Sequence, residues 1–153
     1  MSILSIFKKP AFFKPDEQSR IVTAIQEAEK KTSGEVRVYI ESRCKYVDPL
    51  DRAGEIFYGL KMDKTVESNA VLVYLATKDH QLAVFADRGI HSKTGKDFWG
   101  DQVRVMLNHF NKEDYAAGLI EVIYKIGEAL YQHFPYLSDT DKNELPDDII
   151  FGK

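Results

Sequence analysis

Polar residues able to bind a ligand fall where predicted strands begin or end: Glu35, Asn69, Asp87 and Arg88. Glu35 starts an alternating run, Asn69 precedes the apolar run 70–76, and Asp87 and Arg88 follow the run 81–86. If the run 81–86 returns antiparallel to the run 70–76, all of these residues share one end of a sheet. Carboxylate and amide oxygens suit hard cations such as Ca²⁺ or Mg²⁺, and a guanidinium can bind an oxyanion in bidentate fashion. That end of the sheet is the candidate site.

The connection that leads into the run 70–76 adds two further carboxylates. The metal ligands expected from this arrangement are Glu35, Asp63, Glu67, Asn69 and Asp87. For such a set we expect weak affinity for calcium, with Kd roughly 10⁻⁵ to 10⁻³ M. If the site is catalytic, Asp87 and Arg88 are the expected participants, with Asp87 as ligand or base and Arg88 stabilising negative charge.

A looser anion site is a further hypothesis. Residues 88–96 are expected to form a loop before a helix, and Lys93, Lys96 and free amides at the helix start could bind an anion there. The competing interpretation is structural. The sequence Asp87-Arg88-Gly89 is also typical of a tight turn, in which Asp87 accepts hydrogen bonds from backbone amides and Arg88 forms an ion pair. The sequence leaves both interpretations open.

Three familiar motifs are absent. Residues 89–96 fail as a phosphate loop because five residues separate the glycines and Asp97 replaces the magnesium-binding hydroxyl. Residues 139–150 fail as a calcium loop because Glu144 replaces the turn glycine and Ile150 replaces the bidentate glutamate. The four histidines show no i,i+4 pair and no cysteine companion, which argues against zinc.

The hydrophobic pattern predicts a layered α/β fold. Residues 36–41 alternate apolar and polar side chains, as in a half-buried strand, whereas residues 70–76 are continuously apolar, as in a central strand. A helix between them makes a βαβ unit with parallel strands, and residues 81–86 complete an antiparallel hairpin. The expected architecture is a three-layer α/β/α sandwich with a small mixed sheet and a C-terminal helical pair.

Helices are predicted from capping residues and apolar spacing. Pro15 and Pro49 suit first helical positions, and Asp48 suits an N-cap. Apolar residues recur at helical spacing between residues 99 and 110 and again between residues 115 and 131. The expected organisation is an N-terminal docking segment over residues 1–14, one domain over residues 15–137, and an acidic C-terminal tail over residues 138–153.

Composition excludes several classes of protein. The formal net charge is −3 and the basic residues are scattered, so no nucleic-acid partner is expected. One cysteine, Cys44, excludes an internal disulfide and fits a reducing compartment. No apolar run approaches the roughly 20 residues of a spanning helix, and the apolar start is broken at Lys8-Lys9-Pro10, so no signal peptide or stable membrane insertion is expected. A monomer in the cytoplasm is therefore expected.

Several motifs together resemble the TPM-domain family, over roughly residues 15–135. Members occur in bacteria, in chloroplasts, where they are linked to photosystem repair, and as an animal receptor accessory protein. The matching segments are Thr32-Ser33-Gly34-Glu35-Val36, Asn69-Ala70-Val71-Leu72, Asp87-Arg88-Gly89-Ile90 and Asp114-Tyr115-Ala116-Ala117-Gly118-Leu119. The resemblance implies an α/β/α sandwich and a divalent-metal site, usually discussed as calcium. Phosphatase activity has been attributed to some members.

Within this resemblance, Glu35, Asn69 and Asp87 match motif positions of the family, whereas Asp63 and Glu67 come from topology alone. Ala70 stands where many members have glycine. Many members also carry an export signal and a membrane anchor or glycine-rich tail. Neither is expected from this sequence, so this chain resembles a short cytoplasmic bacterial form. Two functions are expected: a non-enzymatic binding module with a weak cation site and an unidentified protein partner, or a metal-dependent phosphomonoesterase.

Overall fold

The computed structural model describes residues 12–46, 48–112, 114–136 and 149–152. In chain order its elements are α2 (Pro15–Glu29), β1 (Glu35–Glu41), α3 (Pro49–Gly59), the short 3₁₀ helix η1 (Met62–Lys64), β2 (Ala70–Ala76), β3 (Gln81–Ala86), α4 (Arg88–Thr94), α5 (Lys96–Asn111), α6 (Tyr115–His133) and β4 (Ile149–Phe151). The order of strands and helices expected over residues 15–134 is thus largely confirmed, with one difference at α4 described below.

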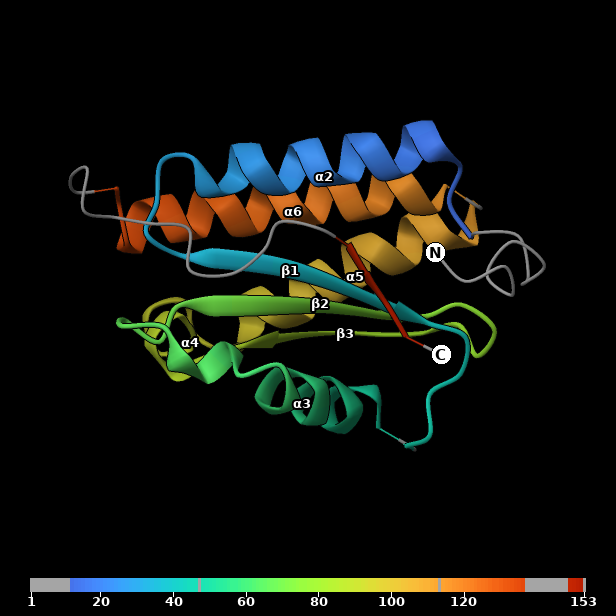
Figure 1. The fold of residues 1–153 in the computed structure, drawn as a ribbon, viewed down its shortest axis with the longest axis horizontal. Coiled ribbons are helices and arrows are strands. Elements are labelled where there is room, and N and C mark those ends of the chain that lie inside the picture. Colours follow the sequence, from blue (N-terminus) through green and yellow to red (C-terminus); the bar gives the residue numbers. More distant parts are fainter. Residues whose placement is uncertain (1–11, 47, 113, 137–148, 153) are drawn as a thin grey trace, which may run out of the picture.

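The four strands form one mixed sheet in the order β3-β2-β1-β4. β1 and β2 are parallel, and β2 and β3 form the expected antiparallel hairpin. α2, α5 and α6 cover one face of the sheet and α3 covers the other, which gives three layers (Figure 1). The predicted α/β sandwich is therefore confirmed.

The sheet gains a fourth strand from the segment assigned to the C-terminal tail. β4 pairs with β1 in parallel, with Val38 opposite Ile149 and Ile40 opposite Phe151. The amide of Gly152 donates a 2.6 Å hydrogen bond to the carbonyl of Ile40, which extends this pairing. Residues 137–148, the rest of the predicted tail, and residues 1–11 of the predicted docking segment lie outside the described residues.

Sequence chemistry explains where the helices begin. Pro15 opens α2, and the Glu17 carboxylate accepts a 2.9 Å hydrogen bond from the amide of Lys14. The Asp48 carboxylate accepts a 2.9 Å hydrogen bond from the amide of Leu50 at the start of α3, as its predicted N-cap role requires. These caps satisfy amides that have no partner inside the helix.

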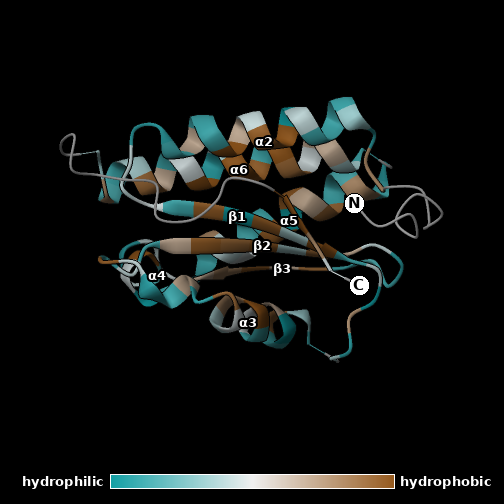
Figure 2. Ribbon diagram, in the orientation of Figure 1, coloured by the Kyte–Doolittle hydropathy of each residue, from teal (hydrophilic) through white to brown (hydrophobic). Residues whose placement is uncertain are grey.

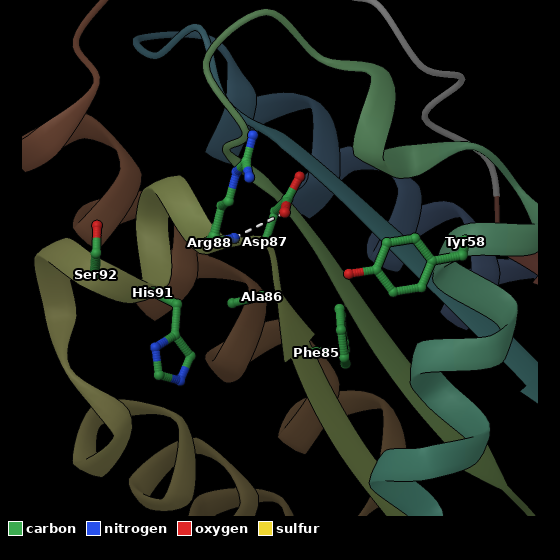
Figure 3. A pocket seen from close by; sticks show the side chains of 7 residues that line it. All are labelled: Tyr58, Phe85, Ala86, Asp87, Arg88, His91 and Ser92. Carbon is green, nitrogen blue, oxygen red and sulfur yellow. Dashed lines mark hydrogen bonds between the residues drawn. The ribbon is translucent and has the colours of Figure 1, made fainter.

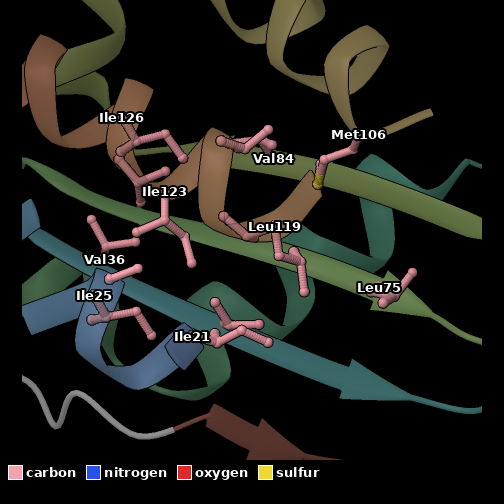
Figure 4. Packing of buried hydrophobic residues seen from close by; sticks show 14 of the residues in the cluster. Ile21, Ile25, Val36, Leu75, Val84, Met106, Leu119, Ile123 and Ile126 are labelled. Atoms are coloured by element: carbon pink, nitrogen blue, oxygen red, sulfur yellow. The ribbon is translucent and has the colours of Figure 1, made fainter. Parts of the chain in front are cut away.

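Two hydrophobic clusters hold the layers together. The larger cluster joins the apolar faces of α2, α5 and α6 to alternate residues of the strands, such as Val36, Leu75 and Val84 (Figure 4). The smaller cluster lies between the sheet and α3 and contains Phe57, Leu72 and other side chains. Figure 2 shows hydrophobic colouring concentrated on the strands and on the helix sides that meet them. Because β2 is buried along its full length, its ends are fixed in position.

No helix among the described residues is both long enough and apolar enough to cross a membrane.

Candidate functional site

Strand register brings two of the predicted carboxylates, Glu35 and Asp87, into one row across the sheet. Glu35 pairs with Ala70, and the amide of Asp87 donates a 2.9 Å hydrogen bond to the carbonyl of Ala70. Ala70 and Phe85 belong to the cluster beneath α3, so alternation places Glu35 and Asp87 on that same face. Adjacent strands lie about 4.8 Å apart, which leaves the Glu35 and Asp87 backbones roughly 10 Å apart with only an alanine methyl between them.

The polar groups at this end of the sheet are buried. Glu35 and Asn69 are 1% exposed and Asp87 is 6% exposed. The Asn69 amide nitrogen donates a 3.2 Å hydrogen bond to the Ser33 hydroxyl, and Asp87 Oδ1 accepts a 2.7 Å bond from the amide of Arg88. Asn69 Oδ1 and Asp87 Oδ2 have no hydrogen-bond partner among the described residues. Buried oxygen atoms of this kind are costly to leave unsatisfied, so they mark the place where a ligand would be stabilised.

The two carboxylates added from topology do not join this row. Asp63 lies in η1, and its carboxylate is 3.6 Å from the Lys64 ammonium. The Glu67 side chain is exposed, although its backbone packs beside Gly89. Within the described ranges, no three His, Cys, Asp or Glu side chains are grouped so that they could hold a metal ion. The donors that the register brings to this end are therefore Glu35, Asn69 and Asp87.

The donor chemistry of these three residues fits a hard cation. They offer two carboxylates and an amide oxygen, the ligand types that Ca²⁺ prefers, and two of their oxygen atoms lack partners among the described residues. They do not supply the six to eight oxygen ligands of a complete calcium site. These three residues would therefore supply only part of the ligands of a calcium ion.

Residues 88–94 form helix α4, so the expected loop over residues 88–96 is wrong. Asp87 is its N-cap, which is the role anticipated by the structural interpretation of Asp87-Arg88-Gly89. The second part of that interpretation is not found: Arg88 is exposed and takes part in no ion pair found among the described residues. Lys93 and Lys96 are exposed as well, one in α4 and one at the start of α5.

A pocket of about 380 Å³ lies beside Asp87. It is lined by Tyr58, Phe85, Ala86, Asp87, Arg88, His91 and Ser92. Figure 3 shows Tyr58 entering from α3 with its hydroxyl directed into the pocket, His91 and Ser92 opposite on α4, and the end of β3 between them. Neither Lys93 nor Lys96 lines it. The pocket combines aromatic and charged groups at the candidate site.

Sequence reasoning missed Arg37, which lies two residues beyond Glu35 on the same face of β1. Burial lowers the pKa of Arg37, while the nearby charges of Glu35 and Glu29 act in the opposite direction and raise it. Arg37 is therefore a positive charge that competes with any cation for Glu35. The alternation of β1 could have indicated this role of Arg37 from the sequence, because it places residues 35 and 37 on one face of the sheet.

A second polar cluster at the opposite end of β1 was also missed. Glu41 is 5% exposed and receives two hydrogen bonds from Arg52 of α3, from Nε at 2.8 Å and from Nη2 at 2.9 Å. The Tyr74 hydroxyl also donates to Glu41. Burial raises the pKa of Tyr74, and the Glu41 hydrogen bond raises it further. All the members of this cluster are partnered, so it anchors α3 to the sheet rather than offering a ligand site.

Gly89 fixes the distance between α4 and the segment before β2. A Cβ atom at residue 89 would lie 2.2 Å from the carbonyl oxygen of Glu67 and 2.5 Å from that of Ser68. We expect Gly89→Ala to push these backbones apart and to lower the free energy of unfolding by about 1–3 kcal/mol. Urea denaturation measures this change. Gly100→Ala in α5, whose Cβ would meet only an Arg104 nitrogen at 4.0 Å, is the control and should be neutral or stabilising.

Comparison with known proteins identifies the family. A profile of the TPM domain matches residues 6–129. The NMR structure of the BA42 protein from the psychrophilic bacterium Bizionia argentinensis is similar, with 38% sequence identity and a TM-score of 0.85, covering 95% of this chain and 99% of that one. None of the curated proteins matches this chain.

Two more distant structures share the fold. The N-terminal domain of the cg2496 protein from Corynebacterium glutamicum has 13% identity and a TM-score of 0.62, covering 78% of this chain and 74% of that one. The N-terminal domain of a protein from P. gingivalis has 17% identity and a TM-score of 0.62, covering 84% of each chain. With a profile match over most of its length and a relative at 38% identity, this chain belongs to the TPM-domain family.

Proposed function

We propose that this TPM domain is a binding module in which Glu35, Asn69 and Asp87 hold a divalent cation, with calcium preferred and magnesium as the alternative. One observation carries the proposal: Asn69 Oδ1 and Asp87 Oδ2 are buried at one end of the sheet with no partner among the described residues. The buried Glu35 carboxylate lies at the same end of the sheet. Two carboxylates facing one alanine methyl repel each other, and a cation between them would relieve that repulsion.

A protein partner is the second half of the proposal. α6 carries exposed aromatic side chains on its outer side, with Tyr124 39% and Tyr131 54% exposed. Tyrosine is among the side chains enriched in protein interfaces. The proposed setting is the cytoplasm, with the domain as a monomer that binds no nucleic acid, in keeping with its formal charge of −3.

Calcium should stabilise the folded domain through this site. Because calcium binds only the folded state, about a hundredfold excess over Kd raises the free energy of unfolding by about 2.7 kcal/mol. Asp87→Asn keeps an N-cap for α4 but removes one ligand charge, so it should abolish this gain without unfolding the domain. The measurement is a calcium titration of EDTA-treated protein, followed by thermal melting and amide chemical shifts.

Asp48→Asn is the matched control, because Asp48 is likewise an N-cap aspartate but lies at the start of α3. It should leave the calcium response intact. The proposal fails if millimolar calcium and magnesium change neither the melting temperature nor the shifts of residues 35, 69 and 87. It also fails if Asp87→Asn and Asp48→Asn respond to calcium alike.

A metal-dependent phosphomonoesterase is the second candidate function, because Asp87, Arg88 and His91 line one pocket. A cation held there would supply polarisation of a phosphate oxygen, and Arg88 would stabilise developing negative charge. The assay is phosphate release from an aryl phosphate in the presence of Mg²⁺ or Ca²⁺. Release no faster than the blank, or release unaffected by Asp87→Asn, would eliminate this candidate.

A further inference from the structure

The pocket beside Asp87 has an aromatic wall. Tyr58 and Phe85 form this wall, with ring centroids 5.9 Å apart and planes at 75°. Phe57 contacts both rings, at centroid distances of 5.3 Å and 4.8 Å. Tyr58 is 56% exposed, so the wall can be reached from solvent. An apolar or aromatic group placed against the wall would remove part of this ring surface from water.

Two neighbouring residues of opposite charge line the same pocket without pairing. Figure 3 shows the side chains of Asp87 and Arg88 extending in the same direction from the end of β3. Among the described residues, Arg88 takes part in no ion pair and Asp87 Oδ2 has no hydrogen-bond partner. Asp87 is 6% exposed, so water does little to solvate its charge. The carboxylate can therefore accept hydrogen bonds from a ligand, and the guanidinium can donate to one.

The geometry of β3 sets the spacing between the charged groups and the wall. Asp87 directly follows β3, and Phe85 is two residues before it, so the two side chains lie on one face of the sheet. Residues two apart along a strand are separated by about 6.6 Å. A small molecule whose charged groups are joined directly to an apolar side chain can span this distance and contact both parts of the pocket.

Charge matching favours a ligand that carries both signs of charge. With the histidine of the pocket neutral, the charges of Asp87 and Arg88 cancel. At the same end of the sheet, the positive charge of Arg37 lies near the negative charges of Glu35 and Glu29, which leaves an excess of negative charge there. A simple anion would be repelled by these carboxylates and a simple cation by Arg88. A molecule with one ammonium and one carboxylate is attracted at both ends.

We propose that the pocket binds a free α-amino acid with an apolar or aromatic side chain. Its ammonium would donate hydrogen bonds to the Asp87 carboxylate, and its carboxylate would accept hydrogen bonds from the Arg88 guanidinium. Its side chain would lie against Tyr58 and Phe85. This inference goes beyond the proposed cation site and does not rest on it, because no metal ion takes part.

The size of the pocket favours a single amino acid. Its volume of about 380 Å³ is near the lower end of the range of roughly 300–1,000 Å³ for small-ligand pockets. A nucleotide would need more space and would bring phosphate charges close to Asp87. For a ligand as small as an amino acid we expect a Kd on the order of 1 mM or somewhat lower.

The test titrates L-phenylalanine into the whole protein in EDTA at neutral pH and follows amide chemical shifts. Residues 58, 85, 87 and 88 should shift in a saturable way. The compound 3-phenylpropanoate lacks the ammonium and phenethylamine lacks the carboxylate, so each should bind at least about tenfold more weakly. Glycine lacks the side chain that contacts the wall and should also bind more weakly.

Variants assign each contact. Arg88→Met should remove the advantage of L-phenylalanine over phenethylamine, and Asp87→Asn, which keeps an N-cap for α4, should remove its advantage over 3-phenylpropanoate. Tyr58→Ala should weaken the binding of L-phenylalanine more than that of glycine. Lys93→Met is the matched control for Arg88→Met, because Lys93 is also an exposed cation of α4 but does not line the pocket. It should leave binding unchanged.

The outcomes separate this inference from the proposed function. If millimolar L-phenylalanine causes no saturable shift, or if phenethylamine or 3-phenylpropanoate binds as tightly, the inference is overturned. Equal effects of Arg88→Met and Lys93→Met overturn the role of Arg88. If phenylalanyl-glycine amide binds as tightly, the occupant is the first residue of a protein and a free amino acid is excluded. A calcium response without an amino-acid response overturns this inference alone, and the reverse result overturns the cation site alone.

Discussion

Replacing Arg52 with methionine is expected to lower the free energy of unfolding by about 3–5 kcal/mol, the typical cost of removing one partner of a buried ion pair. Arg52 holds both oxygens of Glu41, at 2.8 and 2.9 Å, and their side chains are only 15% and 4% exposed. Without Arg52 the Glu41 carboxylate stays buried and keeps the hydrogen bond from the Tyr74 hydroxyl. Urea denaturation gives the change directly.

Arg43→Met is the matched control. Arg43 forms a 3.2 Å ion pair with Asp79, but its side chain is 71% exposed. Exposed pairs contribute about 0–1 kcal/mol, so this variant should be nearly neutral. Adding Glu41→Gln to Arg52→Met removes the stranded charge and should recover part of the loss. Equal losses for Arg52→Met and Arg43→Met would contradict the buried-pair interpretation.

The ion pair between Arg52 and Glu41 should make the free energy of unfolding depend on pH under acidic conditions. Burial alone would raise the pKa of Glu41, but the hydrogen bonds from Arg52 and Tyr74 outweigh it and hold the pKa below its usual value. A carboxylate with a lowered folded-state pKa contributes stability that is fully present above its unfolded pKa, near 4.3. That contribution is lost as the pH falls through the folded value. The difference in free energy of unfolding between the wild type and Arg52→Met should therefore become smaller below about pH 4.

The residues that lie at this end of the sheet could largely be predicted, because their placement depends only on the direction in which each strand runs. The hydrophobic pattern indicates which segments are strands and on which face of the sheet each side chain lies. Residues 70–76 are continuously apolar, and residues 36–40 alternate apolar and polar side chains. Once β3 returns antiparallel to β2, Asp87 must lie at the end where β1 and β2 begin. The placement of Glu35, Asn69 and Asp87 therefore followed without any knowledge of packing.

The features that escaped prediction depend on packing or on contacts between distant segments. α4 is seven residues long and polar, so it has no apolar period, and its position depends on the close approach at Gly89. β4 has only three residues, too few to show an alternation. The contact between Arg52 and Glu41 depends on how α3 lies across the sheet, which spacing along the chain does not determine.

The wall of the pocket should depend strongly on one buried ring. Phe57 of α3 is fully buried against the sheet and contacts both Tyr58 and Phe85. We expect Phe57→Ala to lower the free energy of unfolding by about 3–5 kcal/mol, through lost burial and the cavity left behind. Chemical denaturation measures this loss, and amide shifts of residues 58, 85 and 87 report on the pocket.

Phe57→Leu separates volume from the specific ring contacts. It keeps most of the buried apolar volume and should cost less than about 1.5 kcal/mol. Gly54 allows α3 to approach the sheet closely, because a Cβ there would lie 3.1 Å from the Phe85 ring. The helix is therefore held by Phe57 and Phe85 near the pocket and by Arg52 at the other end of β1. If Phe57→Ala costs no more than Phe57→Leu, or leaves the pocket shifts unchanged, α3 is positioned by Arg52 alone and the aromatic wall is not needed to place it.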